Sequence, residues 1–181
     1  MSSISSAVRL DLLLQFEHAA RTAGASAERI RSSAAELRAA VERIAYGKIA
    51  IAEPLDLPAE LFSELRHISG VVTERSKETL ASCDVGITDA FAGIARTGSV
   101  CITVDHDYAG AISLVTRMHI VVLSADTIVE RPMDVFTRDC VGGKGLERNF
   151  VFVTGPSATA DMGPLVRGVH GPHKLHIIVL R

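Results

Sequence analysis

Tryptophan is absent from this sequence of 181 residues, and only 4% of the residues are aromatic. Neither sign of charge dominates, because 19 Lys and Arg stand against 21 Asp and Glu. With no Trp and no basic cluster around its two Tyr, the sequence lacks the usual nucleic-acid-binding surface. The sequence also lacks a signal-peptide pattern and any stretch of the roughly 18 apolar residues that a membrane span needs. The composition therefore predicts a cytoplasmic protein without a membrane span.

Cysteine is scarce, and Cys83, Cys101 and Cys140 are too far apart in the sequence to form a CxxC-type pair. Since an iron–sulfur cluster usually needs four cysteine ligands, we expect this chain to bind no cofactor of that kind alone. Walker loops, dinucleotide-binding glycine motifs, nucleophile elbows and zinc-protease motifs are absent as well. Hydrolase, nucleotidase and protease functions thus lose their usual support.

Hydrophobic residues, by contrast, make up 48% of the chain, and its length suits one domain with a single core. Helical periodicity predicts two N-terminal helices. The first spans about 5–23 and is ended by Gly24, and the second starts after a cap at Ser26 and is stopped by Gly47. Their apolar faces would pack on this domain or on a partner subunit. We expect N-terminal helices within 1–47 and an α/β core within 48–181.

Beyond residue 47, short apolar runs alternate with helical stretches, which is the pattern of an α/β domain. Strands are predicted at 48–52, 100–104, 119–123, 150–154 and 175–180. The last three are nearly continuous apolar runs, as expected of strands covered on both faces. The predicted fold class is therefore α/β, with a mostly parallel sheet flanked by helices.

A run of small and hydroxyl-bearing residues, Thr154 to Asp161, directly follows one predicted strand. Ligands of open α/β sheets bind beyond the carboxyl ends of strands, where this run is expected to lie. Gly155 would allow close backbone approach, while Ser157, Thr159 and the N–H groups of a following helix would bind a phosphate or carboxylate. Asp161 would order the loop or hold a hydroxyl group. The alternative is a strand-to-helix turn that Ser157 or Thr159 merely caps.

Thr97, Gly98 and Ser99 form a second turn of small residues before the strand predicted at 100–104. Their hydroxyl groups and amides could also serve a ligand, although such turns are common in proteins that bind nothing.

Three histidines, His170, His173 and His176, lie close together in the sequence. A Gly-Pro turn separates the first two, and the third begins a predicted strand, so their imidazoles should point in different directions. We therefore predict a turn and a strand end here in preference to a metal site.

The sequence also resembles a known family over about 85–180. The segments that carry the resemblance, in the right order, are 87–90, 94–95, 97–99, 119–122, 152–161, 168–172 and 175–179. On these segments the chain resembles the lactate-utilisation protein C family, whereas the N-terminal helices match only in general character. The resemblance implies the fold shared by sugar-phosphate isomerases and coenzyme A transferases. It also implies a role beside two iron–sulfur partner subunits in oxidising L-lactate to pyruvate.

Two departures from the family pattern stand out. Arg96 replaces a Glu directly before the Thr-Gly pair, and 115–117 lack a proline found before the strand at 119. Loss of that carboxylate removes a nucleophile or base, which argues against a covalent transferase mechanism at this position.

We expect an accessory subunit that is not catalytic alone. It would bind a small anion or cofactor at the 154–161 loop, with the 97–99 turn opposite and His170 at the same site. One alternative is an independent isomerase or acyl-transferase, whose ionisable candidates are Arg96, Asp89, Asp161 and His170. Another is an assembly module without a ligand. The sequence leaves the oligomeric state open, a homo-oligomer included.

Overall fold

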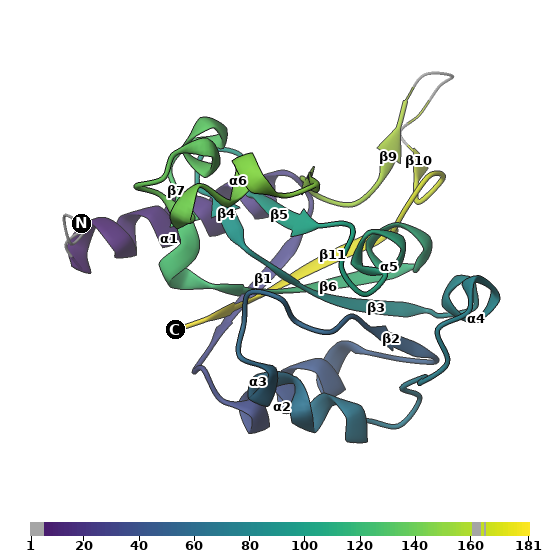
Figure 1. Ribbon diagram of the computed structural model, residues 1–181. Helices are drawn as coiled ribbons and strands as arrows, with labels where there is room; N and C mark the ends of the chain where they lie inside the picture. The colour runs from purple at the N-terminus through teal and green to yellow at the C-terminus, as the bar shows by residue number, and fades with distance from the viewer. Residues whose placement is uncertain (1–5, 161–163, 165) are drawn as a thin grey trace.

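A parallel sheet of five strands forms the centre of the molecule in the computed structural model, which describes residues 6–160, 164 and 166–181 (Figure 1). All of its pairings are parallel, and the strand order is β1-β11-β6-β3-β2. The strands are β1 (Ser26–Ile30), β2 (Ile49–Ile51), β3 (Val85–Ala90), β6 (Met118–Ser124) and β11 (Lys174–Leu180). The predicted α/β fold with a mainly parallel sheet is confirmed.

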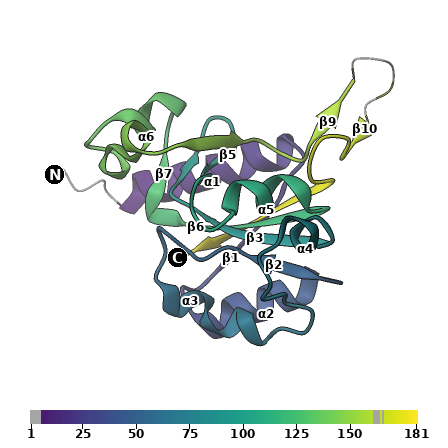
Figure 2. The ribbon, with the colours of Figure 1, turned by 45° about the vertical axis from the view of Figure 1, so that its right-hand side comes forward.

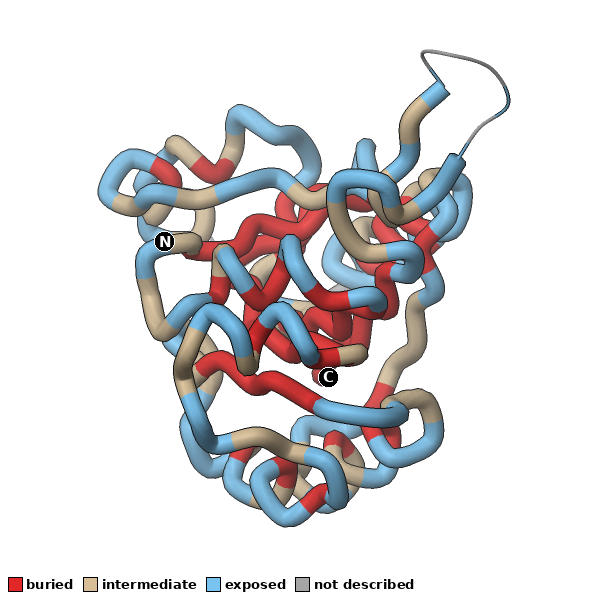
Figure 3. Tube along the Cα trace, turned by 90° about the vertical axis from the view of Figure 1, so that its right-hand side faces the viewer, coloured by how far each residue is buried: buried red, intermediate tan, exposed pale blue. Residues whose placement is uncertain are grey.

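Helices and a second sheet cover the two faces of this central sheet (Figure 1). The helices are α1 (Ser6–Thr22), α2 (Ala34–Ile44), α3 (Ala59–Ser63), α4 (Lys77–Ala81), α5 (Ala109–Val115) and α6 (Lys144–Glu147), with the short 3-10 segments η1 (Glu64–His67), η2 (Ala125–Thr127), η3 (Pro132–Phe136) and η4 (Val141–Gly143). On β6, Ile120 and Val122 pack toward α2, α3 and η1, while Val121 and Leu123 pack toward α1, α5 and the second sheet. Figure 3 shows the resulting concentration of buried residues in the middle of the molecule.

The second sheet has four strands in the order β7-β4-β5-β8. Its strands are β4 (Ala92–Ile94), β5 (Ser99–Thr103), β7 (Ile128–Val129) and β8 (Phe150–Val153). Both antiparallel pairings involve β5, which lies between β4 and β8. A separate hairpin, β9 (Ala158–Thr159) with β10 (Val166–Arg167), projects from the body (Figure 2).

The prediction that the 150–154 strand is covered on both faces is wrong. This segment forms β8, which pairs only with β5 and therefore ends the second sheet. Val151 and Phe152 on β8 are 39% and 42% exposed. An apolar run alone does not distinguish a central strand from an edge strand with apolar side chains at the surface.

The second N-terminal helix begins later than predicted. Ser26 starts β1, and the helix cap is Ser33, whose Oγ accepts a hydrogen bond from the N–H of Glu36 at the start of α2. β1 pairs in parallel with β11 along its whole length, and Ile30 is buried at its end. Pairing with the sheet has overridden the helical pattern of these five residues. The first 47 residues therefore supply an edge strand as well as two helices.

No helix within 6–160 or 166–181 is long and apolar enough to cross a membrane. The three cysteines carry free thiols, and burial raises the pKa of Cys101 to about 12. A thiol that stays protonated at neutral pH is a poor nucleophile, so Cys101 acts as a small apolar side chain in the core.

Candidate functional site

Four residues predicted from the sequence line a single cavity of about 360 Å³: Thr154, Gly155, Ser157 and His170. We call it the loop cavity. Its other walls are largely apolar and include Val104, Leu114, Val151, Phe152 and Leu175. The 154–157 loop follows β8 of the second sheet, whereas the nearby residues of β6 and β11 lie at the starts of those strands. The cavity thus lies at amino ends of the parallel sheet, not at the predicted carboxyl ends.

A chain of hydroxyl groups joins the two predicted turns. The Oγ1 of Thr97 lies 2.6 Å from the Oγ of Ser99, which in turn lies 2.6 Å from the Oγ1 of Thr154. Ser99 is buried between its two partners. The structure therefore brings the 97–99 turn against the start of the loop, and these contacts fix the Thr154 side chain at the edge of the loop cavity.

The two predicted site glycines pack against α1 and the residue that follows it. Gly98 and Gly155 have φ angles of +67° and +69°. A Cβ atom added to Gly98 would lie 2.1 Å from the N of Ala20, and one added to Gly155 would lie 2.1 Å from the O of Ala23. The close backbone approach expected at Gly155 is thus made to the end of a helix of the chain itself.

The loop does not present its amides as predicted. Ser157 donates its N–H to the carbonyl oxygen of Pro172 at 2.9 Å and accepts from the N–H of Gly168 at 2.9 Å. The helix expected after the loop is replaced by β9, so that part of the prediction is wrong. Thr159 lies on β9 in the projecting hairpin and is not among the residues lining the loop cavity, and Asp161 lies outside the described residues.

His119, which the sequence analysis did not select, lines the loop cavity near the start of β6. The side chain is fully buried, and its Nε2 lies 3.0 Å from the Oγ1 of Thr88. Its Nδ1 is also buried and has no hydrogen-bond partner in the described part of the chain. Burial lowers the pKa of His119 to about 3, so the ring is neutral at physiological pH. The sequence signal that could have pointed to His119 is its place at the start of an apolar run predicted to be a strand.

A second hollow adjoins the loop cavity, sharing Leu114, His170 and Gly171 with it. It adds Arg117 and His173 to the lining and is more polar. Arg117 is exposed, and its guanidinium forms no ion pair with the described residues. Together the two hollows offer apolar walls, a buried imidazole in the loop cavity and an exposed cation in the polar hollow.

Two other sequence candidates, Asp89 and Arg96, lie away from the loop cavity. Asp89 is buried on β3, where its Oδ2 accepts hydrogen bonds from the backbone N–H groups of Leu55, Asp56 and Leu57. Burial raises the pKa of its carboxyl group against the opposing effect of those hydrogen bonds. Arg96 is exposed beyond the end of β4. Neither residue lines the loop cavity, so the two are not placed to act there.

Of the three clustered histidines, only His176 lies outside both hollows. His176 connects two strands, because its Nδ1 lies 2.6 Å from the Oγ of Ser26 and its Nε2 lies 3.0 Å from the Oε1 of Glu28. His170 lines both hollows, and His173 lines only the polar one. Across the described ranges, no three His, Cys, Asp or Glu side chains are grouped so that they could hold a metal ion.

A family model, the LUD domain, matches residues 15–180 of this sequence. This chain belongs to the LUD domain family. A solved structure of a DUF162 family protein from Deinococcus radiodurans is similar to this LUD chain with a TM-score of 0.69 and 25% sequence identity, covering 96% of this chain and 98% of that one. This likeness covers nearly all of the chain.

Relatives of this LUD chain include a "Lactate utilization protein C" of Oceanobacillus iheyensis, 31% identical over 63% of this chain and 51% of the relative. Another protein of that name, from Deinococcus radiodurans, is 29% identical over 95% of this chain and 81% of its own length. A "Lactate utilization protein B" of Bacillus pumilus is 24% identical over 58% of this chain and 21% of the relative. The chain spans about half the length of the Oceanobacillus relative.

The packing of Gly155 on α1 predicts a loss of stability when a side chain is added. Gly155→Ala should lower the free energy of unfolding by at least about 3 kcal/mol, since the added methyl group collides with a backbone oxygen. Gly142→Ala is the matched control, because Gly142 has the same φ of +69° with nothing near the added atom. It should lose only the left-handed backbone cost of about 1–2 kcal/mol. Equal losses in urea denaturation would show that Gly155 does not pack as described.

The lowered pKa of His119 predicts a pH-dependent stability. The unfolded histidine gains a proton as the pH falls through about 6.5, whereas the folded one stays neutral until about pH 3. The unfolded state therefore binds more protons in this window, and the contribution of His119 to stability is complete above it and is lost as the pH falls. The difference between wild type and His119→Asn should change by about 1.4 kcal/mol per pH unit there. A difference that does not vary with pH would contradict a buried, neutral His119.

Proposed function

We propose that this LUD chain is an accessory subunit of a lactate-oxidising assembly and binds a small organic anion or cofactor in the loop cavity. The lactate-utilisation names of its relatives support the biological role. With three cysteines in the whole chain, iron–sulfur clusters that accept electrons belong to partner subunits. Free thiols and the family resemblance support a cytoplasmic location.

The observation that carries the ligand proposal is the Nδ1 atom of His119. It is buried at the loop cavity with no partner among the described residues. A buried polar atom left unpaired costs about 1–3 kcal/mol, and a ligand that supplies the missing hydrogen bond recovers part of that cost. The neutral ring accepts or donates at Nδ1, according to whether Nε2 donates to Thr88 or accepts from it.

The adjoining polar hollow favours a ligand with a carboxylate. A carboxylate would lie toward Arg117, His170 and His173, where positive charge and imidazole donors are available. A short carbon skeleton would cover the apolar wall at Leu114 and Phe152. Its hydroxyl or carbonyl group would then face His119. L-lactate and pyruvate both have this arrangement of groups, and both are small for the cavity.

Calorimetric titration with L-lactate and pyruvate tests the binding site. Leu114→Trp should weaken binding of whichever acid binds by at least about ten-fold, because Leu114 lines both hollows and the larger indole would occupy space in them. Leu114 is 57% exposed, so the protein should still fold. Leu146→Trp is the matched control, since Leu146 is 63% exposed on α6 and does not line the cavity. Binding that is equal in both variants, or absent from wild type, would contradict the proposed ligand site.

The accessory role predicts that the purified chain alone does not oxidise lactate with an electron-accepting dye. Adding iron–sulfur lactate-utilisation subunits should restore dye-linked turnover, and Leu114→Trp should reduce it at equal complex formation. Substantial turnover by the chain alone would contradict this role and favour an independent enzyme. Full turnover with Leu114→Trp would leave the chain as an assembly module without a functional ligand.

A further inference from the structure

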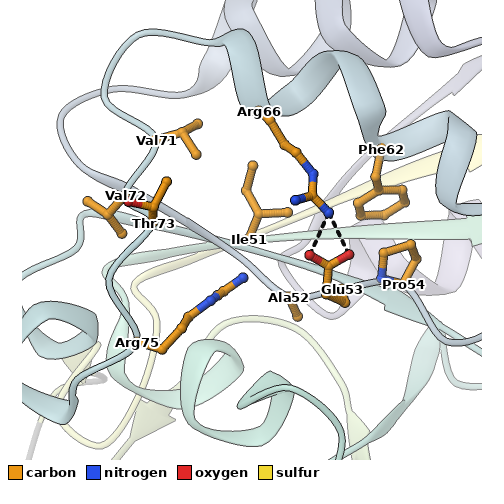
Figure 4. A pocket seen from close by; sticks show the side chains of 10 residues that line it. All are labelled: Ile51, Ala52, Glu53, Pro54, Phe62, Arg66, Val71, Val72, Thr73 and Arg75. Atoms are coloured by element: carbon orange, nitrogen blue, oxygen red, sulfur yellow. Dashed lines mark hydrogen bonds and ion pairs between the residues drawn. The ribbon is translucent and has the colours of Figure 1, made fainter.

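A separate cavity, of about 240 Å³, lies just beyond the carboxyl end of β2 (Figure 4). We call it the arginine pocket. Its walls are mainly apolar, formed by Ile51, Ala52, Pro54, Phe62, Val71 and Val72. Val71 lies alongside β2, which it joins through an isolated parallel bridge to Ile49. The carboxyl end of a parallel strand is where open α/β sheets bind ligands.

Two guanidinium groups reach into the arginine pocket from different sides (Figure 4). Arg66 is occupied, because its NH2 donates to both carboxylate oxygens of Glu53, at 2.5 and 2.7 Å. Arg75 is only partly occupied. Its NH2 lies 3.3 Å from the Oδ2 of Asp107, whereas its NH1 is buried with no hydrogen-bond partner in the described part of the chain. An unpaired nitrogen on a charged group calls for an acceptor.

The rim of the arginine pocket is held in place before any ligand arrives. Asp107 accepts the N–H of Glu53 at 2.6 Å in addition to its contact with Arg75. Asp107 and Tyr108 have φ angles of +40° and +60°, a conformation that costs free energy in residues other than glycine. The three N–H bonds accepted by Asp89 fix the backbone immediately after Glu53. A prearranged site loses little conformational entropy on binding.

We propose that the arginine pocket binds a small monocarboxylic acid, whose carboxylate accepts a hydrogen bond from the NH1 of Arg75 and whose apolar group packs among Ile51, Phe62 and Val72. The two arginines and the two carboxylates of Glu53 and Asp107 cancel in formal charge. A monoanion is therefore better matched than a doubly charged phosphate. The pocket volume restricts the acid to a few carbon atoms. This site is separate from the loop cavity and does not rest on the function proposed for it.

Titration with sodium propionate, followed by amide NMR shifts, tests the proposal. Propionate should shift the amides of 51–54 and 71–75 and bind at least about ten-fold more tightly than inorganic phosphate. Arg75→Gln should weaken propionate binding by at least about ten-fold. Thr73→Trp should do the same, since Thr73 is exposed and lines the pocket, and this variant leaves every charge in place. Thr73→Trp decides the matter if Arg75→Gln fails to fold.

Leu114→Trp separates the two sites, because it blocks the loop cavity and should leave propionate affinity unchanged. Propionate affinity unaffected by Thr73→Trp, or lost only in Leu114→Trp, would overturn the arginine pocket as a carboxylate site. Phosphate binding as tight as propionate would overturn the stated ligand class. Failure of the loop cavity appears separately, as L-lactate and pyruvate affinities that do not change in Leu114→Trp.

Discussion

Strand β6 pairs along its length with β3 on one side and with β11 on the other, and apolar layers cover both of its faces. Its backbone polar groups are satisfied by the ladder, and its side chains are withdrawn from water. A histidine on such a strand must be neutral, because charging it there would require desolvating a cation. The state of His119 therefore follows from the position of β6, and so does the character of the cavity that it lines.

The loop cavity and the arginine pocket, on which the functional proposals rest, lie at opposite ends of parallel strands. The loop cavity lies at amino ends, and the arginine pocket lies at a carboxyl end. The loop cavity forms where the second sheet and the 154–157 loop close over the starts of β6 and β11. The arginine pocket forms beyond the end of β2, where Asp89 and Asp107 secure the chain that follows the strand. The first offers a neutral imidazole and apolar walls, and the second offers a guanidinium. Both would suit small organic acids, by different chemistry.

Two of the central strands, β6 and β11, could be predicted because a buried parallel strand is a run of apolar residues. The third, β3, was not predicted as a strand, because Gly86, Thr88 and Asp89 interrupt its apolar residues. The N-terminal edge strand could not be predicted either, since Ser26–Ile30 also fits a helical pattern and only pairing with β11 decides its structure. The loop after Phe150–Val153 could also be located from the sequence. The sheet to which that strand belongs could not, because an apolar run carries no information about its partner strand.

The candidate site, like the fold, could be predicted only in part from the sequence. Hydroxyl residues far apart in the sequence, Ser99 and Thr154, proved to be in contact. Gly155 does make a close approach, but to the backbone of Ala23, just after α1, which no local motif identifies. His119 and Arg75 could not be recognised as site residues from the sequence. Each stands out only because the folded structure leaves one of its buried nitrogen atoms without a hydrogen-bond partner among the described residues.

The most direct test of the loop cavity is the ¹⁵N NMR signal of the His119 ring, recorded at pH 7 while L-lactate and then pyruvate are added. We expect a neutral imidazole whose Nδ1 resonance shifts until it saturates with at least one of these acids. The His176 ring is the control, because it pairs with Ser26 and Glu28 away from the cavity and should keep its chemical shifts. A His119 resonance that stays fixed at saturating concentrations of both acids would contradict the claim that this histidine receives the ligand.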